Sequence, residues 1–320
     1  YTHPVKFQTD IFARQRSEPL LPIEASLSTD NMRTSLLELL QEPRTLEETG
    51  VPHDFLLGLA LKVVYHHGTL RGWQVARAMR LNFSGVVDPL LHELKQHHFV
   101  EVTGGNHQNR ASFHYRITDK GSTYARELLS RNRYAGPCPV SLEHYVEIVR
   151  TQAQYRPRVD RTDVQFAMQG LVISEELLDR IGPAVNSFRS IFIYGPPGNG
   201  KTSIARALAH QLLSEYVMVP HAIYESGHVI KVFDLEVHPV IGSETAQLAR
   251  TDGLDKRWVV CGTPIVITGG ELTLNDLDLA WSENNRYYEA PVQLKANNGL
   301  LLIDVFGRQR VAPRDLLNRW

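Results

Sequence analysis

The sequence predicts an α/β protein: a core built on a phosphate-binding loop (P-loop), preceded by a smaller α+β unit. Three observations lead to this prediction. Residues 195–202 spell G-x-x-x-x-G-K-[ST] between an apolar stretch and a helical one. A second apolar stretch, "LLLI", runs directly into the acid Asp304. Before the loop, residues 51–132 carry helical periodicity and one hairpin pattern.

Bulk composition excludes several classes of protein. The chain has 320 residues, 42% hydrophobic and 22% charged, which is typical of a globular protein with room for two domains. Its net charge of −1 gives no overall attraction to nucleic acid or to anionic membranes. No apolar run approaches the ~20 residues that cross a bilayer, and we expect no membrane insertion. Two cysteines, Cys138 and Cys261, are too few for a disulfide framework or a metal site and favour a cytoplasmic location.

Residues 1–50 are mixed and polar and are predicted to form an N-terminal arm. Residues 51–135 follow as a compact unit. Its predicted elements are, in order, a helix that stops at Gly68, a helix with Thr69 as N-cap, a helix capped by Ser84 and kinked at Pro89, the hairpin "FVEVT"–"FHYRIT", and a last helix, "DKGSTYARELLSR".

Three helices and a hairpin in this order resemble a winged helix-turn-helix domain. The resemblance implies a recognition helix for the major groove of DNA and a wing that contacts phosphate. Residues 51–130 hold nine Lys and Arg against six Asp and Glu, and a basic edge could form from Arg71, Arg77, Arg80 and Arg110. The recognition helix has mixed charge and few base-reading side chains, with Asp88, His92, Glu93 and Lys95. DNA and protein partners both stay open, and the weak charge favours protein.

A linker is predicted over residues 136–162, which carry Gly136, Pro137 and Pro139. The core domain is predicted over residues 163–320. It opens with the helix "ISEELLDRIGPAVNSF", broken at Gly182 and Pro183, and continues with a short buried strand, "SIFIYG", and the helix "SIARALAHQLLSEY". The loop motif therefore has a strand before it and a helix after it, as a P-loop requires.

The P-loop predicts a nucleotide site. Glycines let the backbone N–H groups turn inward toward phosphate oxygens, and the following helix adds the positive end of its dipole. Lys201 is expected to contact the β- and γ-phosphates, and Thr202 to ligate Mg²⁺. The alternative, a glycine-rich turn without a ligand, is disfavoured by the complete motif. The predicted binding residues are Gly195, Pro196, Pro197, Gly198, Asn199, Gly200, Lys201, Thr202 and Ser203.

Asp304 is the predicted metal acid. P-loop sites use a second carboxylate, at the end of a strand, to hold Mg²⁺. Taken alone, "LLLID" would more often be a buried strand that ends in an ordinary aspartate, but the P-loop makes the metal role the better interpretation. We therefore predict ATP and Mg²⁺ as cofactors, with Thr202 and Asp304 at the metal and with Lys201 and Asp304 as catalytic residues.

The loop "GPPGNGKT" and the run "YEAPVQLKANNGLLLID" resemble the AAA+ ATPases, in the branch of MoxR-type ATPases, enhancer-binding activators and magnesium-chelatase subunits. That branch carries A-x-x-G-x-L-x-x-D-E, which is matched by Ala296, Gly299, Leu300 or Leu301, and Asp304. The resemblance implies a glutamate after the metal acid. Val305 stands there instead and cannot orient a water, so ATP binding is better supported than hydrolysis. Upstream acids that could substitute are Glu271, Glu283 and Glu289.

The resemblance also implies further contacts. Adenine contacts belong to the segment before the first core helix, where Leu171, Val172 and Ile173 stand. The long interval between the loop and Asp304 leaves room for two predicted hairpins, "VPHAIYESGHVIKVFD" and "KRWVVCGTPIVITGGELT". In that branch, insertions line a ring pore or touch a client. Candidates for such contacts are Trp281, Tyr287 and Tyr288, with internal packing equally favoured.

The chain stops 16 residues after Asp304, before the sensor strand, arginine finger and lid that the resemblance implies. We therefore expect the core to be C-terminally incomplete. A cationic cluster could face a neighbouring subunit's nucleotide, although a solvated surface is the favoured interpretation for Arg308, Arg310, Arg314 and Arg319.

The predicted function is an ATP-binding, AAA+-like ATPase. It is expected to form a homo-oligomer, a hexameric ring, and to remodel or regulate a macromolecular partner. The alternative is an ATP-responsive DNA-binding transcriptional regulator. A small-molecule P-loop kinase is disfavoured, because the insertions and the winged helix would have no role in it.

Overall fold

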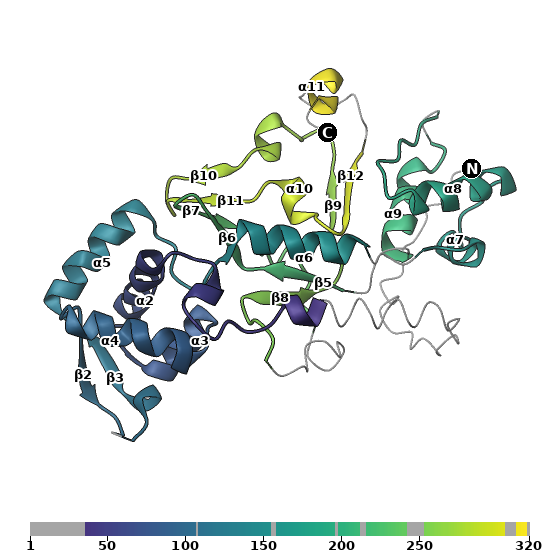
Figure 1. Ribbon diagram of the computed structural model, residues 1–320. Coiled ribbons are helices and arrows are strands. Elements are labelled where there is room, and N and C mark those ends of the chain that lie inside the picture. Colours follow the sequence, from purple (N-terminus) through teal and green to yellow (C-terminus); the bar gives the residue numbers. More distant parts are fainter. Residues whose placement is uncertain are drawn as a thin grey trace.

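The structure, a computed structural model, describes residues 36–106, 108–154, 158–195, 198–211, 216–241, 253–304 and 312–318. Figure 1 shows a helical unit at one side, a central layer of strands behind α6 (Leu142–Gln154), and three further helices at the opposite side: α7 (Arg161–Ala167), α8 (Glu175–Asn186) and α9 (Lys201–Gln211). Among the described helices, none is long and apolar enough to cross a membrane.

The N-terminal unit, residues 42–139, packs helices beside a small antiparallel sheet with the strand order β1-β3-β2. Its elements are the 3-10 helix η1 (Glu47–Thr49), α2 (His53–His67), β1 (Thr69–Arg71), α3 (Gly72–Met79), the π-helical turn η2 (Phe83–Val87), α4 (Asp88–Gln96), β2 (Val100–Gly104), the 3-10 helix η3 (Arg110–Ser112), β3 (His114–Ile117) and α5 (Asp119–Arg131).

The connection between the first two helices differs from the prediction. α2 does end at Gly68, whose φ of 72° is a conformation that glycine adopts most easily. Thr69, however, does not cap the next helix. It lies in β1 opposite Arg116, and α3 begins only after the extended residue Arg71. The strand forms because β3 offers it a ladder partner, which the local sequence could not reveal.

The start of the third helical segment is also corrected. Asn82, rather than Ser84, caps it, and its side-chain oxygen accepts a hydrogen bond from the N–H of Gly85 at 3.1 Å. Pro89 falls in the first turn of α4, where a missing N–H group breaks no hydrogen bond. The proline therefore begins a regular helix after the π-helical turn instead of kinking one.

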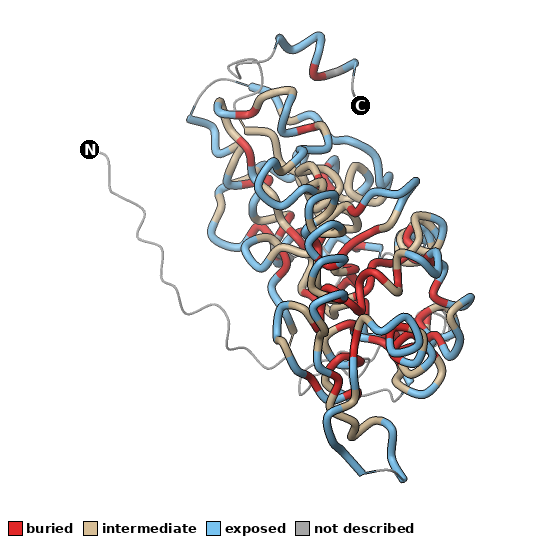
Figure 2. The backbone as a smooth tube through the Cα atoms, turned by 90° about the vertical axis from the view of Figure 1, so that its left-hand side faces the viewer, coloured by how far each residue is buried: buried red, intermediate tan, exposed pale blue. Residues whose placement is uncertain are grey.

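The core of the N-terminal unit is closed to solvent. Figure 2 shows the buried segments in the interior of the molecule and exposed segments at both ends of the view. Burying one large apolar side chain contributes roughly 1.5–3 kcal/mol, so this cluster is the main source of stability in the unit. Side chains in it that are 0% exposed include Leu56, Leu59, Met79, Leu90, Leu91 and Leu94.

Residues 136–162, predicted as a linker, contain folded core elements instead. The central five-stranded sheet has the order β10 (Ala280–Ser282), β11 (Tyr287–Glu289), β7 (His228–Lys231), β6 (Ala222–Glu225) and β4 (Val140–Ser141). α6 packs on neighbouring strands through Tyr145 and Ile148, which are 5% and 0% exposed. Leu36 and Leu40, from the predicted arm, join the same cluster. The polar outer face of α6 gave the segment the composition of a linker.

Of the two predicted hairpins, one is present and one is wrong. β6 and β7 pair antiparallel around Ser226 and Gly227. The second predicted pair separates: β8 (Trp258–Cys261) pairs antiparallel with β5 (Val217–Pro220), whereas β9 (Ile265–Thr268) pairs in parallel with β12 (Leu300–Ile303). The residues between them bond elsewhere. The N–H of Gly262 donates to Pro239, and the carbonyl of Pro264 accepts from Leu300.

Some of the aromatic residues near the sheet edge pack inside the molecule, and one is exposed to solvent. Tyr287 packs edge-on against Tyr134 of the N-terminal unit, with ring centroids 5.6 Å apart. Trp281 is 40% exposed and meets Tyr288 at 5.0 Å. Between these strands and β12 lies α10 (Val292–Lys295), and before them the 3-10 helix η5 (Leu274–Leu277). Internal packing therefore describes Tyr287, while Tyr288 is half-buried and also packs edge-on against His228, so only Trp281 of the three is exposed.

The phosphate-loop unit, residues 158–211, has a small core of its own. Six buried side chains from α7, α8, α9 and their connections form it: Val159, Val164, Ala167, Met168, Ile181 and Ile204. The predicted break at Gly182 and Pro183 is wrong, because α8 runs through both residues to Asn186. A short helix, α11 (Pro313–Leu317), follows the core near the C-terminus.

The predicted strand "SIFIYG" is not formed, although the residues are described. Residues 190–195 have no ladder partner among the described strands. Their apolar side chains are largely in solvent, with Ile191, Phe192 and Tyr194 at 47%, 67% and 84% exposure. A parallel strand needs a neighbouring backbone to satisfy its N–H and C=O groups, and β12 is paired only with β9 in the described part of the chain.

A buried ion pair joins the N-terminal unit to the central strands. Arg257 and Asp255 are 1% exposed each, and the guanidinium and carboxylate meet at 2.7 Å. Arg257 also donates to the carbonyls of Thr49 and Pro139, at 2.7 and 3.2 Å. Both ends of the N-terminal unit are thereby fixed to one side chain of the strand layer. Phe55 adds an aromatic contact with Tyr224 of β6 at 4.8 Å.

Both cysteines are free and buried. Burial raises the pKa of the Cys138 thiol to about 11 and that of Cys261 to about 12. Neither thiol therefore ionises near neutral pH, which suits small packing residues rather than metal ligands. In the described ranges, no group of three His, Cys, Asp or Glu could hold a metal ion.

Candidate functional site

The phosphate loop connects residues 190–195 to α9. Gly195, Gly198 and Gly200 have φ values of 150°, 85° and 71°, and the last two lie well inside the region that glycine favours. A Cβ at any of the three would meet nothing within 4 Å, so backbone conformation rather than crowding calls for glycine. Lys201 begins α9, and its Nζ donates to the carbonyl of Gly195 at 3.0 Å. The lysine thus lies folded over the loop.

The remaining loop residues lie around this turn. Asn199 and Ser203 are exposed to solvent. Pro196 and Pro197 lie outside the described residues. The loop therefore presents an open surface at the N-terminal end of an eleven-residue helix, where backbone N–H groups have no partner within the helix.

Asp304 meets the loop at Thr202, although 102 positions separate them in sequence. The Thr202 hydroxyl lies 3.1 and 3.2 Å from the two carboxylate oxygens of Asp304 and donates to them. The parallel pairing of β12 with β9 carries Asp304 to this point, and its N–H donates to the carbonyl of Thr268 at 2.7 Å. A hydroxyl and a carboxylate at this separation form an oxygen-rich corner suited to a hard cation such as Mg²⁺.

The three residues predicted to contact adenine do not form one wall. Leu171 and Ile173 are half-buried and pack against the core of the phosphate-loop unit. Val172 is fully exposed, at 108% of its reference area. The alternation follows from an extended segment with one face on the core.

The acids considered as substitutes for a catalytic glutamate lie at different places. Glu271 follows β9, and its carboxylate accepts the N–H of Gly269 at 2.7 Å, which holds the pKa of that carboxyl below its usual value. Glu289 lies 3.8 Å from Lys231 on the central sheet, and Glu283 is exposed in the β10–β11 turn. Only Glu271 therefore lies at the sheet edge from which Asp304 emerges.

Several predicted residues fall outside the described ranges: Val305, Arg308, Arg310 and Arg319. Arg314 is described and is exposed on α11. This placement matches the favoured interpretation of a solvated arginine.

The contacts that Lys295, shortly before β12, makes with His238 and Asp234 were not predicted from the sequence. His238 is 1% exposed, its Nε2 donates to the carbonyl of Lys295 at 2.9 Å, and burial lowers its pKa. Lys295 in turn pairs with Asp234 at 2.7 Å. The run "KANNG" combines two asparagines with a glycine, a turn signal that could have marked an ordered connection into the strand.

Comparison with known proteins gives one family match. Residues 191–243 match the AAA family, the ATPase family associated with various cellular activities. No protein of curated function matches the chain.

Among solved structures, the chain is similar to reduced AbfR bound to DNA, at 15% identity over 33% of this chain and 74% of that one, with a TM-score of 0.21. It is similar to the YusO protein from Bacillus subtilis at 18% identity over 53% and 94%, also with a TM-score of 0.21. It is similar to BpsR of Bordetella bronchiseptica, a protein whose DNA binding is regulated by 6-hydroxynicotinic acid, at 10% identity over 56% and 99%, with a TM-score of 0.20. Scores this low carry no argument about fold or function. The family match contains the loop from Gly195 to Thr202, and it supports an ATPase of the AAA type.

Proposed function

We propose that the chain binds ATP together with Mg²⁺ through the loop at residues 195–202 and through Asp304. The observation that carries this proposal is the contact between the Thr202 hydroxyl and the Asp304 carboxylate at 3.1 and 3.2 Å. Two oxygen ligands from distant parts of the sequence meet at the start of a helix, beside a lysine. The AAA match over the loop supports the same function.

The residues present fit both ATP and Mg²⁺. The glycine-rich turn and the first turn of α9 offer backbone N–H groups to phosphate. Lys201 adds a positive charge, and its Nζ, which donates to the Gly195 carbonyl, can donate to phosphate oxygens instead. Thr202 would ligate the metal directly, and Asp304 would hold it directly or through water. When bound, Mg²⁺ would offset the negative charge of the phosphate groups.

The binding proposal is tested by calorimetry on the Lys201→Ala variant. The substitution removes the cation that faces the phosphates, and we expect ATP affinity to fall by at least about a hundredfold, because charge-assisted hydrogen bonds contribute roughly 1.5–3 kcal/mol each. Arg206→Ala is the matched control: it removes an exposed cation from the same helix, one turn further on. Equal ATP affinity in wild type and Lys201→Ala would refute the site.

Nucleotide binding is proposed to drive assembly of a homo-oligomer, expected to be a hexameric ring, that remodels or regulates a macromolecular partner. Exposed apolar side chains on the edge of the central sheet support a contact surface: Trp281 is 40% exposed and Leu279 is 46% exposed. Light scattering with and without ATP and Mg²⁺ tests the assembly. A single monomeric mass under both conditions contradicts the ring.

Hydrolysis is proposed to be slow, because valine follows the metal acid. General-base assistance typically contributes ~10²–10⁴-fold in rate, and Val305 provides none. Val305→Glu should therefore raise phosphate release by at least roughly tenfold. Phosphate release by the Glu271→Gln variant, measured in the same assay, tests whether the acid after β9 already activates the water. Brisk hydrolysis by the Val305 form, unchanged in Val305→Glu, would show that another group activates the water.

A second candidate function is an ATP-responsive DNA-binding regulator. The observation in its favour is the N-terminal unit, whose element order and β1-β3-β2 sheet resemble the arrangement expected of a winged helix. One face of α4 is exposed, with His92, Lys95 and Gln96, and Arg110 is exposed beside the wing. These side chains suit weak phosphate contact better than base reading. Anisotropy of labelled duplexes over a salt series tests this function, and tight sequence-selective binding at physiological salt would favour it over remodelling.

A further inference from the structure

Strand β12 carries Asp304, but its own side chains do not determine its register. All four residues are leucine or isoleucine, and all four are half-buried. A slip by one residue in either direction would place leucine where leucine stands at two positions and put leucine and isoleucine in each other's place at a third. At the fourth position the slip brings in a residue from outside the strand, Asp304 in place of Ile303 or Gly299 in place of Leu300. Register is strongly specified only where the pattern of side chains distinguishes the two faces of a sheet. Groups outside the strand must therefore fix it.

Register matters here because Asp304 is the next residue after the strand. A strand advances ~3.3 Å per residue, and successive side chains point to opposite faces. A one-residue slip would therefore carry the Asp304 carboxylate away from the Thr202 hydroxyl. In the described part of the chain, β12 has a single neighbour, β9, so one ladder alone would have to resist that slip.

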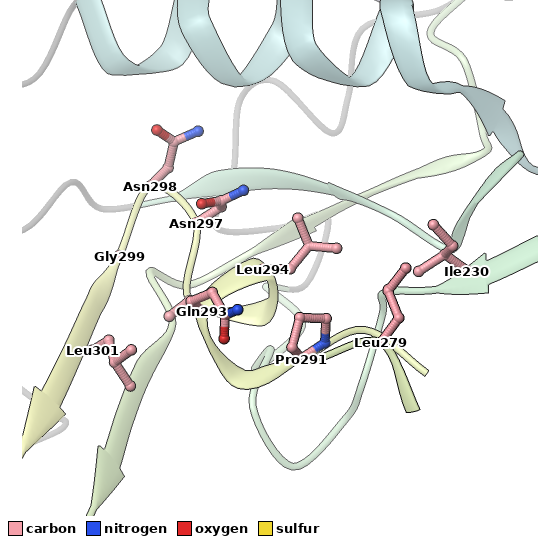
Figure 3. A pocket seen from close by; sticks show the side chains of 10 residues that line it. Ile230, Leu279, Pro291, Gln293, Leu294, Asn297, Asn298, Gly299 and Leu301 are labelled. Atoms are coloured by element: carbon pink, nitrogen blue, oxygen red, sulfur yellow. The ribbon is translucent and has the colours of Figure 1, made fainter. Parts of the chain in front are cut away.

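Two asparagines directly before the strand tie it to α6. Asn297 Nδ2 donates to the Tyr145 hydroxyl at 2.6 Å, and Asn298 Nδ2 donates to the carbonyl of Val149 at 3.2 Å. Tyr145 is 5% exposed and stacks on Trp258, so the anchor point is held by the core. Figure 3 shows the Asn298 amide directed toward the helix above it, and both asparagines line a cavity of about 550 Å³.

Gly299 blocks a slip in both directions. A Cβ at this position would lie 2.0 Å from the carbonyl oxygen of Pro264, far inside contact distance. A one-residue slip would bring either Asn298 or Leu300 to this place, and each has a Cβ. The N–H of Leu300 donates to the same oxygen at 2.9 Å, so the close approach coincides with the first hydrogen bond of the ladder.

We propose that Asn297, Asn298 and Gly299 are positioning residues that set the register of β12 and thereby place Asp304 against Thr202. The consequence for Mg²⁺ rests on the proposed ATP-binding function, whereas the register itself does not. Asn298 has a φ of 60°, a left-handed conformation that asparagine and glycine adopt more readily than other residues. The turn into the strand therefore requires this residue type for its backbone as well as for its amide.

Hydrogen exchange tests the register without nucleotide. The double variant Asn297→Ala with Asn298→Gly removes both amides and keeps a residue that accepts the left-handed turn. Each lost hydrogen bond contributes about 1 kcal/mol, so the amides of residues 300–304 should exchange at least about tenfold faster. The protecting bond from the Asp304 N–H to Thr268 is the most informative of them. Unchanged exchange across 300–304 in the double variant overturns the proposal.

The matched control is Gln152→Ala. Gln152 also lies on α6 and exchanges two hydrogen bonds with the backbone of Met218, at 2.6 and 3.3 Å, so its loss costs α6 a comparable pair of contacts. Met218 lies in β5, which does not lead to Asp304. Exchange at 300–304 should match wild type in this control. A rise equal to that of the double variant would show a general loosening of α6 and would overturn the proposal.

ATP affinity with Mg²⁺ and in EDTA supplies the second readout. In the double variant, the gain in affinity that Mg²⁺ confers should shrink at least about tenfold, while affinity in EDTA stays at the wild-type value. Tyr145→Phe removes the Asn297 bond from the helix side and should give part of the same loss. An equal loss with and without Mg²⁺ indicates a purely structural role and overturns the proposal. Wild-type binding that ignores Mg²⁺ refutes the proposed function instead, and hydrogen exchange still decides the register.

Discussion

The N-terminal unit and the phosphate-loop unit differ in how far each closes its own core. In the N-terminal unit, large side chains from three helices are 0% exposed, and every strand has a ladder partner within the unit. In the phosphate-loop unit, buried core residues such as Ile181 and Ile204 are 7% exposed, and Phe192 and Tyr194 lie mostly in solvent. The region with the clearest chemical motif is thus the one with the weaker core of its own.

The difference teaches that a motif and a stable core are separate properties of a sequence. The P-loop spelling specifies backbone turns and two side chains that serve a ligand, and these need little burial. The helices of the N-terminal unit instead bury apolar faces against each other, and this burial stabilises them without help from distant segments. In the described part of the chain, the hydrogen bonds from Thr202 to Asp304 connect the phosphate-loop unit to the end of β12.

The largest expected difference in stability between the two units concerns the buried ion pair. Asp255→Ala leaves the Arg257 guanidinium buried without its carboxylate, which should lower the free energy of unfolding by about 3–5 kcal/mol. Asp179→Ala, which breaks the exposed pair with Arg161 in the phosphate-loop unit, should cost about 1 kcal/mol or less. Urea denaturation of both variants measures the difference. Equal losses would show that burial of the pair does not decide its contribution.

Core truncation in each unit gives the next largest effect. Leu59→Ala removes a side chain that is 0% exposed in a large cluster and should cost roughly 2–5 kcal/mol. Ile204→Ala, in the smaller cluster of the phosphate-loop unit, should fall at or below the lower end of that range, because the site can collapse or admit water. Hydrogen exchange resolved by segment measures each loss within its own unit. A larger loss for Ile204→Ala would reverse the comparison.

Acid should act first on the well-packed strand layer. Burial, with a smaller effect from the Arg80 charge, lowers the pKa of His221 to about 4, whereas an unfolded chain has a histidine pKa near 6.5. Between these values only the unfolded chain takes up the proton. Stability is therefore complete above about pH 6.5 and falls as the pH is lowered toward 4, by an amount on the order of 3 kcal/mol.

Unfolding free energies at pH 7 and pH 4.5 measure this loss. His221→Asn removes the titrating ring and should flatten the profile in that window, leaving the smaller contribution of His238, whose pKa burial also lowers. A profile that keeps its full slope in His221→Asn would assign the acid sensitivity to other groups.

The smallest effect is expected at the exposed segment before the loop. Phe192 is 67% exposed, and substitutions at such sites usually change stability by less than about 0.5 kcal/mol. Phe192→Ser should therefore leave the free energy of unfolding nearly unchanged. A loss above about 2 kcal/mol would mean that this side chain is buried in solution. The phosphate-loop unit would then have a better closed core than the structure indicates.

Patterns that depend on neighbours in sequence were predicted well, and those that depend on distant partners were not. The helices of the N-terminal unit follow from their periodicity, and the turn at Ser226 and Gly227 from its residue types. Thr69 was misplaced because a strand 47 positions later pairs with it. α6 was predicted as part of a linker because its exposed face is polar. The stretch "SIFIYG" was predicted as a strand from its apolar character, which does not supply a ladder partner.

The candidate site shows the same division. Lys201 and Thr202 were predicted as site residues from a motif of consecutive residues, and Asp304 from an acid that follows an apolar run. The structure brings Thr202 and Asp304 together, and their roles toward a nucleotide stay predictions. The support for Asp304 was not identified, because Asn297 and Asn298 act through Tyr145 and Val149, about 150 positions away. Contacts over such a distance in sequence cannot be predicted from the residues next to Asn297 and Asn298.

Arg257 has a practical consequence for anyone who divides the chain into fragments. Its guanidinium joins carbonyls on both sides of the helical unit, at Thr49 and Pro139, to a carboxylate more than 100 residues downstream. A fragment that ends at residue 135 keeps the helices but exposes the surfaces that Cys138 and Tyr224 cover. Fragments cut between apparent domains would therefore expose apolar surface and tend to aggregate. A soluble fragment of the helical unit needs polar residues on the surface that packs against the strand layer in the full chain.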